Sequence, residues 1–155
     1  MRSGVRVGID VGTVRIGVAR SDRDGLLATP VETVDRTSEN PVEQLIEIIS
    51  ELDACEVIVG LPLSLNGGNT PSTEDALSIG RELASQTEVS VRLIDERLTT
   101  VSAHSALRAT GKNQKQTRGV IDQVAAVMIL QHALDTERSS GKLPGKDISE
   151  FPADA

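Results

Sequence analysis

The chain has 155 residues, a length that suits one domain with a single hydrophobic core. The lone cysteine excludes an intramolecular disulfide, and the absence of a signal peptide or membrane-spanning apolar run predicts a cytoplasmic protein with no membrane partner. At face value the net charge of −7 argues against a nucleic-acid ligand, and with an aromatic content of 1% such a ligand would have to be held through its backbone and shape.

The N-terminal part has the pattern of an antiparallel meander. Alternating apolar residues predict strands at residues 5–10 and 15–21, joined by a tight connection around Gly12. A third strand is predicted at residues 26–34, where Pro30 indicates an edge strand or a bulge.

The next segment changes to helical and then to buried-strand patterning. Asn40 and Glu43 predict a capping box for a helix that begins at Pro41. The continuous apolar run at residues 56–61 is typical of a central parallel strand. Cys55 precedes this run, and we expect a small buried side chain there, with a reactive or intersubunit thiol as the alternative.

The rest of the chain alternates helices and a strand. The predicted elements are a helix from Thr70-Pro71 to about Gln86, a strand at 89–95, a helix from Thr99 or Thr100 to about Thr110, a basic loop at 112–119 and a helix at about 120–137. The fold class is therefore α/β, with a mixed five-stranded sheet made of a three-strand meander and two parallel strands, flanked by helices. Residues 139–155 have no period, which predicts a domain at 1–138 followed by a flexible tail.

Charge is segregated along the sequence. Residues 35–56 hold seven acids and only one base, Arg36, which is typical of a solvated acidic face. Residues 97–121 hold no acid and five bases: Arg97, Arg108, Lys112, Lys115 and Arg118. Lys112, Lys115 and Arg118 therefore form either a phosphate-binding loop or a solubilising one.

Three carboxylates stand where burial alone does not explain them. Asp10 ends an apolar strand, Asp95-Glu96 ends another, and Asp122 begins a helix that is apolar nearly all round. Taken singly, they fit an Asx turn, a surface turn and a favourable helix-dipole contact. Together they offer oxygen ligands suited to Mg²⁺ or Mn²⁺, and two such ions about 4 Å apart support phosphodiester hydrolysis.

Four motifs then point to one family. They are Gly8-Ile9-Asp10-Val11-Gly12-Thr13-Val14-Arg15-Ile16-Gly17-Val18-Ala19, Val59-Gly60-Leu61-Pro62-Leu63 with Asn66-Gly67, Asp95-Glu96-Arg97-Leu98-Thr99-Thr100, and Ile121-Asp122-Gln123-Val124-Ala125-Ala126. In this order, across about residues 5–135, they resemble the YqgF/RuvX family of Holliday junction resolvases and pre-16S rRNA nucleases.

The resemblance implies a ribonuclease-H-like fold and a metal-dependent nuclease that acts on pre-rRNA or branched DNA. It implies that Asp10 bridges two Mg²⁺ or Mn²⁺ ions, while Glu96 and Asp122 each complete the shell of one. Adjacent strand residues face opposite sides, so only one of Asp95 and Glu96 can enter the site, and the family's motif favours Glu96.

The remaining candidates are weaker. Thr13 and Arg15 follow Asp10 and could touch phosphate, and Arg97 could stabilise phosphate charge or neutralise Asp95. His104 and His132 are expected on helix surfaces, outside the chemistry.

Two other functions stay open from the residues alone. The turn Asp10-Val11-Gly12-Thr13 also resembles the phosphate-binding turn of actin-like ATPases, although the chain is short and has no second such turn. A ribonuclease-H-like module could instead bind nucleic acid without cutting, but carboxylates that face phosphates would weaken such binding. A junction resolvase needs two coordinated sites, which a homodimer would supply.

Overall fold

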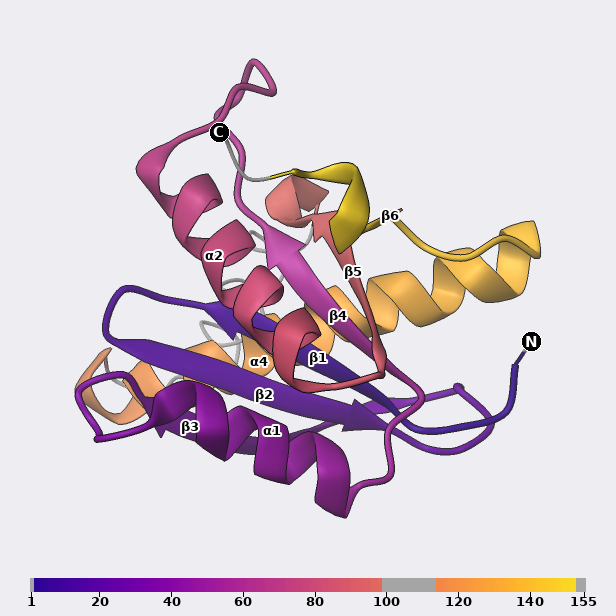
Figure 1. Ribbon diagram of the computed structural model, residues 1–155, viewed down its shortest axis with the longest axis horizontal. Helices are drawn as coiled ribbons and strands as arrows, with labels where there is room; N and C mark the ends of the chain where they lie inside the picture. Colours follow the sequence, from indigo (N-terminus) through magenta and orange to yellow (C-terminus); the bar gives the residue numbers. More distant parts are fainter. Residues whose placement is uncertain (1, 99–113, 153–155) are drawn as a thin grey trace.

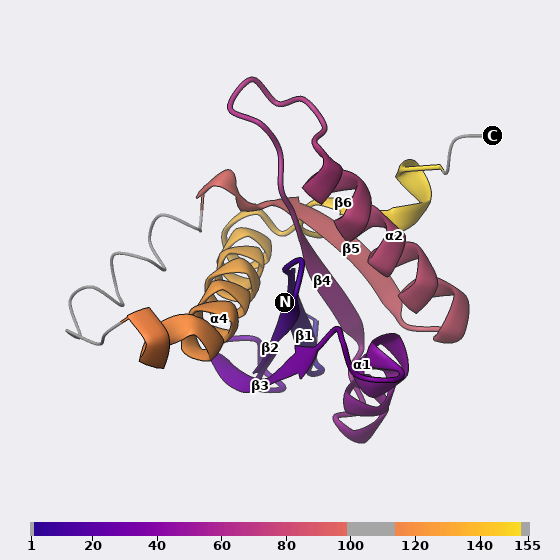
Figure 2. The same cartoon turned by 90° about the vertical axis from the view of Figure 1, so that its left-hand side faces the viewer.

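The computed structural model describes residues 2–98 and 114–152. They form three layers, in which helix α4 covers one face of a sheet and helices α1 and α2 cover the other (Figures 1 and 2). One apolar cluster fills the space under α1 and α2, and a second fills the space under α4.

The sheet has the strand order β3-β2-β1-β4-β5-β6. Its strands are β1 (Arg6–Val11), β2 (Arg15–Ser21), β3 (Ala28–Asp35), β4 (Glu56–Leu61), β5 (Ser90–Asp95) and β6 (Lys146–Asp147). The pairs β1–β2 and β2–β3 are antiparallel, and β1–β4 and β4–β5 are parallel, which confirms the predicted mixed sheet. The strand count is six, because β6 adds an antiparallel strand beside β5.

Strand β3 lies at the edge of the sheet. Its pairing with β2 shifts register between Val18 and Ala19, opposite Pro30. A proline has no N–H to donate to a ladder, so it is tolerated at such an edge irregularity. The prediction drawn from Pro30 is confirmed.

The two helices on one face begin in different ways. In α2 (Pro71–Gln86), the side chains of Thr70 and Thr73 form a capping box. In α1 (Pro41–Glu51), Asn40 makes no side-chain capping bond, so the predicted box with Glu43 is wrong. Asn40 and Glu43 are both exposed, so water can accept hydrogen bonds from the first N–H groups of α1 in place of these side chains.

Helix α4 (Gln114–Ser140) lies directly on the strands of the opposite face. A Cβ atom on Gly17 would come within 1.9 Å of the Asp122 carbonyl oxygen, and one on Gly8 within 2.7 Å of Leu130 Cβ. Only glycine permits this approach of helix to sheet. Because α4 already begins at Gln114, the predicted loop at 112–119 is wrong from that residue on, and Asp122 lies inside the helix rather than at its start.

The helix predicted from Thr99 or Thr100 to Thr110 lies outside the described residues, as do Lys112 and His104. In the part of the chain that the structure does describe, no helix has the length and apolar character needed to cross a membrane.

The C-terminal segment is structured up to Pro152, which corrects the expectation that residues 139–155 form a flexible tail. β6 pairs with β5, and the 3-10 helix η2 (Ile148–Glu150) follows it. Arg81 Nη2 donates to the Phe151 carbonyl over 2.9 Å, and Arg92 Nε donates to the Pro144 carbonyl over 2.6 Å. These partners are more than 50 residues apart, so no local period announces them.

Cys55 is exposed, which corrects the expectation of a buried side chain. It lies one residue before β4, where its N–H donates to the Val5 carbonyl over 2.8 Å. The continuous burial of this run therefore begins at Glu56.

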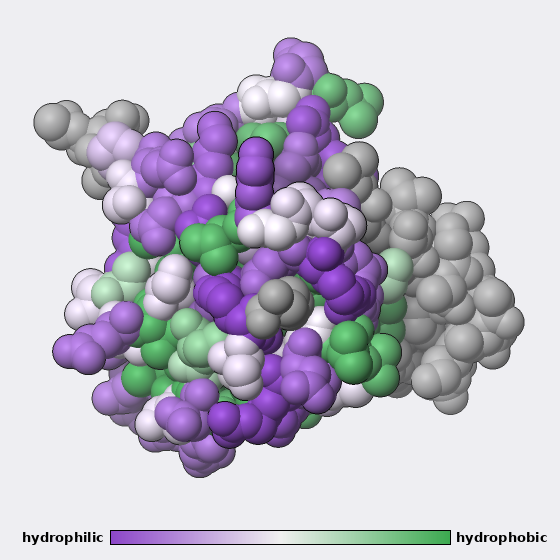
Figure 3. Space-filling model, turned by 90° about the vertical axis from the view of Figure 1, so that its right-hand side faces the viewer, coloured by the Kyte–Doolittle hydropathy of each residue, from purple (hydrophilic) through white to green (hydrophobic). Residues whose placement is uncertain are grey.

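A cluster of charged side chains lies at the amino ends of β1 and β4. Arg2 Nη2 donates to Glu56 Oε1 over 2.9 Å and to Glu137 Oε1 over 2.6 Å, and Arg6 also reaches Glu137. Figure 3 shows hydrophilic side chains gathered in the middle of the side of the molecule that it faces, with apolar side chains in small separate patches around them. This amino-end cluster joins the N-terminus to the last turns of α4.

Candidate active site

Three carboxylates meet at the other end of the sheet. Asp10 lies near the carboxyl end of β1, and Glu96 follows β5 as the first residue of the 3-10 helix η1 (Glu96–Leu98). Since β1, β4 and β5 are parallel, their carboxyl ends share one edge. Asp122 joins them because Gly17, the strand partner of Asp10, lies against the backbone of Asp122.

The side chain of Glu96 turns back over the neighbouring strand. Its Oε2 lies 2.7 Å from the place where a Cβ atom on Gly60 would stand. Any side chain at Gly60 would therefore collide with the Glu96 carboxylate. A glycine inside a strand signals such a close approach, so Gly17 and Gly60 are the residues through which the sequence could have indicated these contacts.

Asp10, Glu96 and Asp122 are called the acidic cluster from here on. Burial and repulsion between like charges determine how readily its carboxyl groups lose their protons. Burial above all, together with the charges of Glu96 and Asp122 and a hydrogen bond with Glu96, raises the pKa of Asp10 to about 7. The pKa of Glu96 is raised as well, chiefly by burial. The two carboxyl groups therefore share a proton up to near-neutral pH.

One cation compensates the acidic cluster. Arg15, the first residue of β2, donates from Nε to Asp122 Oδ2 over 2.8 Å. Thr13 lies in the exposed turn between β1 and β2, which a bond from the Gly12 N–H to the Arg15 carbonyl closes at 2.9 Å. The predicted phosphate contacts Thr13 and Arg15 thus border the acidic cluster, and Arg15 is already bound to a carboxylate.

The acidic cluster has the chemistry of a divalent-cation site. Its donors are carboxylate oxygens, and the proton shared by Asp10 and Glu96 occupies a place that a cation can take. Within residues 2–98 and 114–152, no three acidic, histidine or cysteine side chains are arranged to hold an ion as they stand. Asp122 Oδ2 is bound to Arg15, so a cation beside Asp10 and Glu96 would compete with the Arg15 guanidinium for that oxygen.

Asp95 points to a different partner. Arg97 Nε donates to Asp95 Oδ2 over 2.9 Å, and this guanidinium lowers the pKa of Asp95. The Nη1 of Arg97 donates to the carbonyls of Ser64 and Leu65, each over 3.3 Å. Of the two roles considered for Arg97, the structure shows the neutralisation of Asp95.

The remaining sequence candidates are two bases near the start of α4 and a histidine further along that helix. Lys115 and Arg118 fall within the first turns of α4, and their side chains are outside the described part. His132 lies on α4 and lines a cavity of about 150 Å³ together with Asp95, rather than facing Asp10.

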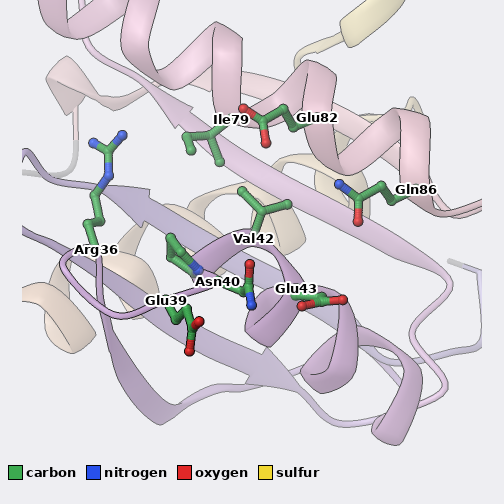
Figure 4. A pocket seen from close by; sticks show the side chains of 9 residues that line it. Arg36, Glu39, Asn40, Val42, Glu43, Ile79, Glu82 and Gln86 are labelled. Atoms are coloured by element: carbon green, nitrogen blue, oxygen red, sulfur yellow. The ribbon is translucent and has the colours of Figure 1, made fainter.

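A larger cavity lies on the opposite face of the sheet, between α1 and α2. It measures about 450 Å³, and Figure 4 shows Glu39, Glu43 and Glu82 around it. Its arginine, Arg36, is bound to Asp75 over 2.5 Å. This cavity is acidic and lies on the face of the sheet opposite α4, so it does not belong to the candidate active site.

Comparisons with known proteins agree with the geometry. A family model described as "RuvX: Holliday junction resolvase" matches residues 4–136. A protein of Clavibacter sepedonicus, named "Putative pre-16S rRNA nuclease", is 56% identical over 147 residues, which cover 94% of this chain and 91% of the relative. A protein of Streptomyces avermitilis with the same name is 50% identical over 150 residues, which cover 96% of each chain.

A solved structure shares the fold. RuvC of T. thermophilus, solved in complex with a Holliday junction substrate, superposes with a TM-score of 0.58 over 93% of this chain and 99% of its own, at 18% identity. At that identity the likeness concerns the arrangement of the sheet and its helices.

Proposed function

Because the chain belongs to the RuvX family of Holliday junction resolvases, we propose that it hydrolyses phosphodiester bonds in structured nucleic acid with Asp10, Glu96 and Asp122. The observation that carries the proposal is the meeting of these three carboxylates, with Arg15 bound to Asp122. Crowded carboxylates are costly to bury, so their persistence at one end of the sheet indicates a site that uses a cation.

In this proposal Asp10 and Glu96 hold Mg²⁺ or Mn²⁺, and Asp122 joins them when it leaves Arg15. The bound cation, in the one-ion or two-ion form, would stabilise negative charge on the phosphate and help to deprotonate the attacking water. The guanidinium of Arg15, released from Asp122, would then face the phosphate backbone together with Thr13.

Three basic residues that precede Asp122 complete the proposed binding surface. Lys112, Lys115 and Arg118 precede Asp122 in the chain, and we assign them to the phosphates that flank the cleaved bond. Such contacts position the backbone without reading bases, which suits a chain with almost no aromatic residues.

The substrate we propose is the 5′ end of pre-16S rRNA, since the relatives at 50–56% identity carry that name. This role places the protein in the cytoplasm. The description of the family model favours a four-way DNA junction as a second candidate, for which two copies of the chain would cut the two strands.

The test offers the purified protein both substrates with Mg²⁺, with Mn²⁺ and with a chelator. We expect cleavage with either metal, no cleavage with the chelator, and loss of cleavage in Asp10→Asn. Asp24→Asn, at an exposed turn near the opposite end of the sheet, is the matched control and should cleave normally. Binding without cleavage under every condition would contradict the proposal and identify a non-catalytic module.

A further inference from the structure

The loop between β4 and α2 displays an apolar side chain in full contact with solvent. Leu65 is 98% exposed, more than any other large apolar side chain in the described residues. Figure 2 shows this loop, residues 62–69, projecting beyond the body of the molecule. A side chain so placed gains nothing from the hydrophobic core.

The loop has a defined structure that is held by hydrogen bonds. Ser64 and Gly68 are paired through a 2.9 Å bond from the Ser64 N–H to the Gly68 carbonyl, and the Gly67 N–H donates to the Ser64 carbonyl over 2.8 Å. Gly67 has a φ of +85°, as a tight hairpin turn requires. The turn runs from Ser64 to Gly67 with Leu65 and Asn66 at its centre, and its first central position accepts most residues, so the turn itself does not call for leucine at position 65.

A tether fixes the loop to the acidic cluster. Arg97 holds the carbonyls of Ser64 and Leu65 with one nitrogen and Asp95 with the others. Arg97 follows Glu96 directly, and Gly60, on the strand that leads into the loop, lies against the Glu96 carboxylate. The tip of the loop and Glu96 therefore keep a fixed relation.

We propose that Leu65 is a wedge that inserts into an opened base step of the substrate, at a branch point or at the end of a duplex. Leucine is one of the apolar side chains that proteins insert between bases to hold a step open. The chain has no Trp or Tyr to stack on such a base, and its one Phe, Phe151, packs on the core. The Asp95–Arg97 pair positions the wedge relative to Glu96.

This inference rests on the proposed function and adds to it a physical reason why the protein would select one kind of nucleic acid over another. A wedge selects nucleic acid by the presence of an unstacked step, whatever its sequence. Unbranched single strands have no step to open, so their cleavage should not depend on Leu65.

The experiment places the fluorescent base 2-aminopurine beside the branch point of a four-way DNA junction and, separately, at the end of an RNA duplex with a single-stranded extension. Asp10→Asn protein, which binds without cutting, is added to each probe. We expect a fluorescence rise on the probe that is the substrate, because 2-aminopurine brightens when it is unstacked. The second substitution Leu65→Ser should abolish the rise and weaken binding about tenfold, whereas Leu65→Met should keep both.

The matched control is Leu27→Ser, at a 61% exposed leucine beside β3 near the opposite end of the sheet, which should change neither signal. With Asp10 intact, Leu65→Ser should slow cleavage of the structured substrate and leave that of a single strand unchanged.

An unchanged fluorescence rise in Leu65→Ser, or an equal loss on structured and single-stranded substrates, would overturn the wedge. If the otherwise unsubstituted protein still cut, the proposed function would survive that result. If that protein cut neither probe, the proposed function itself would fail.

Discussion

The two ends of the sheet carry clusters of charged side chains that are balanced in opposite ways. At the amino end, Arg2 and Arg6 face Glu56 and Glu137, two guanidinium groups for two carboxylates. At the carboxyl end, three carboxylates, Asp10, Glu96 and Asp122, meet, and among the side chains that the structure describes Arg15 is the base that binds one of them, Asp122.

The imbalance appears in the protonation of the two clusters. Arg2 lowers the pKa of Glu137, whereas burial and neighbouring carboxylates raise the pKa of Asp10 to about 7. A balanced cluster stabilises the fold, and an unbalanced one lowers stability until a cation or substrate arrives. Strand β1 contributes to both clusters, so substitutions within one element can separate the two roles.

The largest expected effect is the loss of chemistry in Asp10→Asn. Cleavage should fall by about 10³-fold or more, because the variant cannot offer a charged ligand at the centre of the acidic cluster. Its melting temperature at pH 7 should equal or exceed that of the unsubstituted protein, since a repelling charge is removed. Single-turnover rates and thermal unfolding measure the two quantities, and a large loss of stability would break the comparison.

The opposite result is expected for Glu56→Gln at the amino end. Glu56 is 1% exposed, and the loss of its charge leaves part of the positive charge of Arg2 uncompensated. Arg2 remains half-exposed and bound to Glu137. The free energy of unfolding should fall by about 3 kcal/mol, at the lower limit for a broken buried pair. The folded variant should cleave normally. Glu51→Gln, at an exposed position of α1, is the control in denaturant titrations.

Truncation after Ser139 probes β5, which leads into Glu96. It leaves all the residues of both clusters in place but removes β6 and the contacts of Ile148 and Phe151 with the core. We expect a loss of about 2 kcal/mol in the free energy of unfolding and a smaller change in cleavage. An unchanged free energy of unfolding would show that β6 does not stabilise β5.

The smallest effect is a pH dependence confined to the carboxyl end. The pKa of Asp10 rises on folding from 3.8 to about 7, so the folded state binds more protons between these values. Stability from this group is therefore full below pH 3.8 and falls as the pH rises toward 7, by about 1 kcal/mol between pH 6 and pH 7. Unfolding of Asp10→Asn should lack that slope. Parallel curves for the two proteins would contradict the assignment.

Local signals explain what the sequence could predict. The continuous apolar run of β4 and the Thr70-Pro71 start of α2 specify those elements within their own residues. The acidic cluster was predictable from the sequence positions of its three carboxylates, although Asp122 lies inside α4 and not at its start. The contact of Arg15 with Asp122 and the tether from Arg97 to residues 64 and 65 were not predictable. Such contacts join side chains whose separation only the packed fold determines.

The same limit explains the C-terminal segment. β6 has two residues, and its partner β5 lies some 50 positions earlier, so no window of sequence shows the pairing. The contact of Phe151 with Arg81 is likewise made by a backbone carbonyl, which any residue could supply.

Both edge strands of the sheet have features that disfavour pairing with a further strand. On one side, Pro30 and the register shift interrupt β3, and on the other the brief β6 covers part of β5. Exposed strand borders are where chains add to one another and aggregate, and prolines, bulges and short covering strands are what prevents it. These features disfavour self-association by extension of the sheet, so we expect a dimer of this protein to form through its helices or loops.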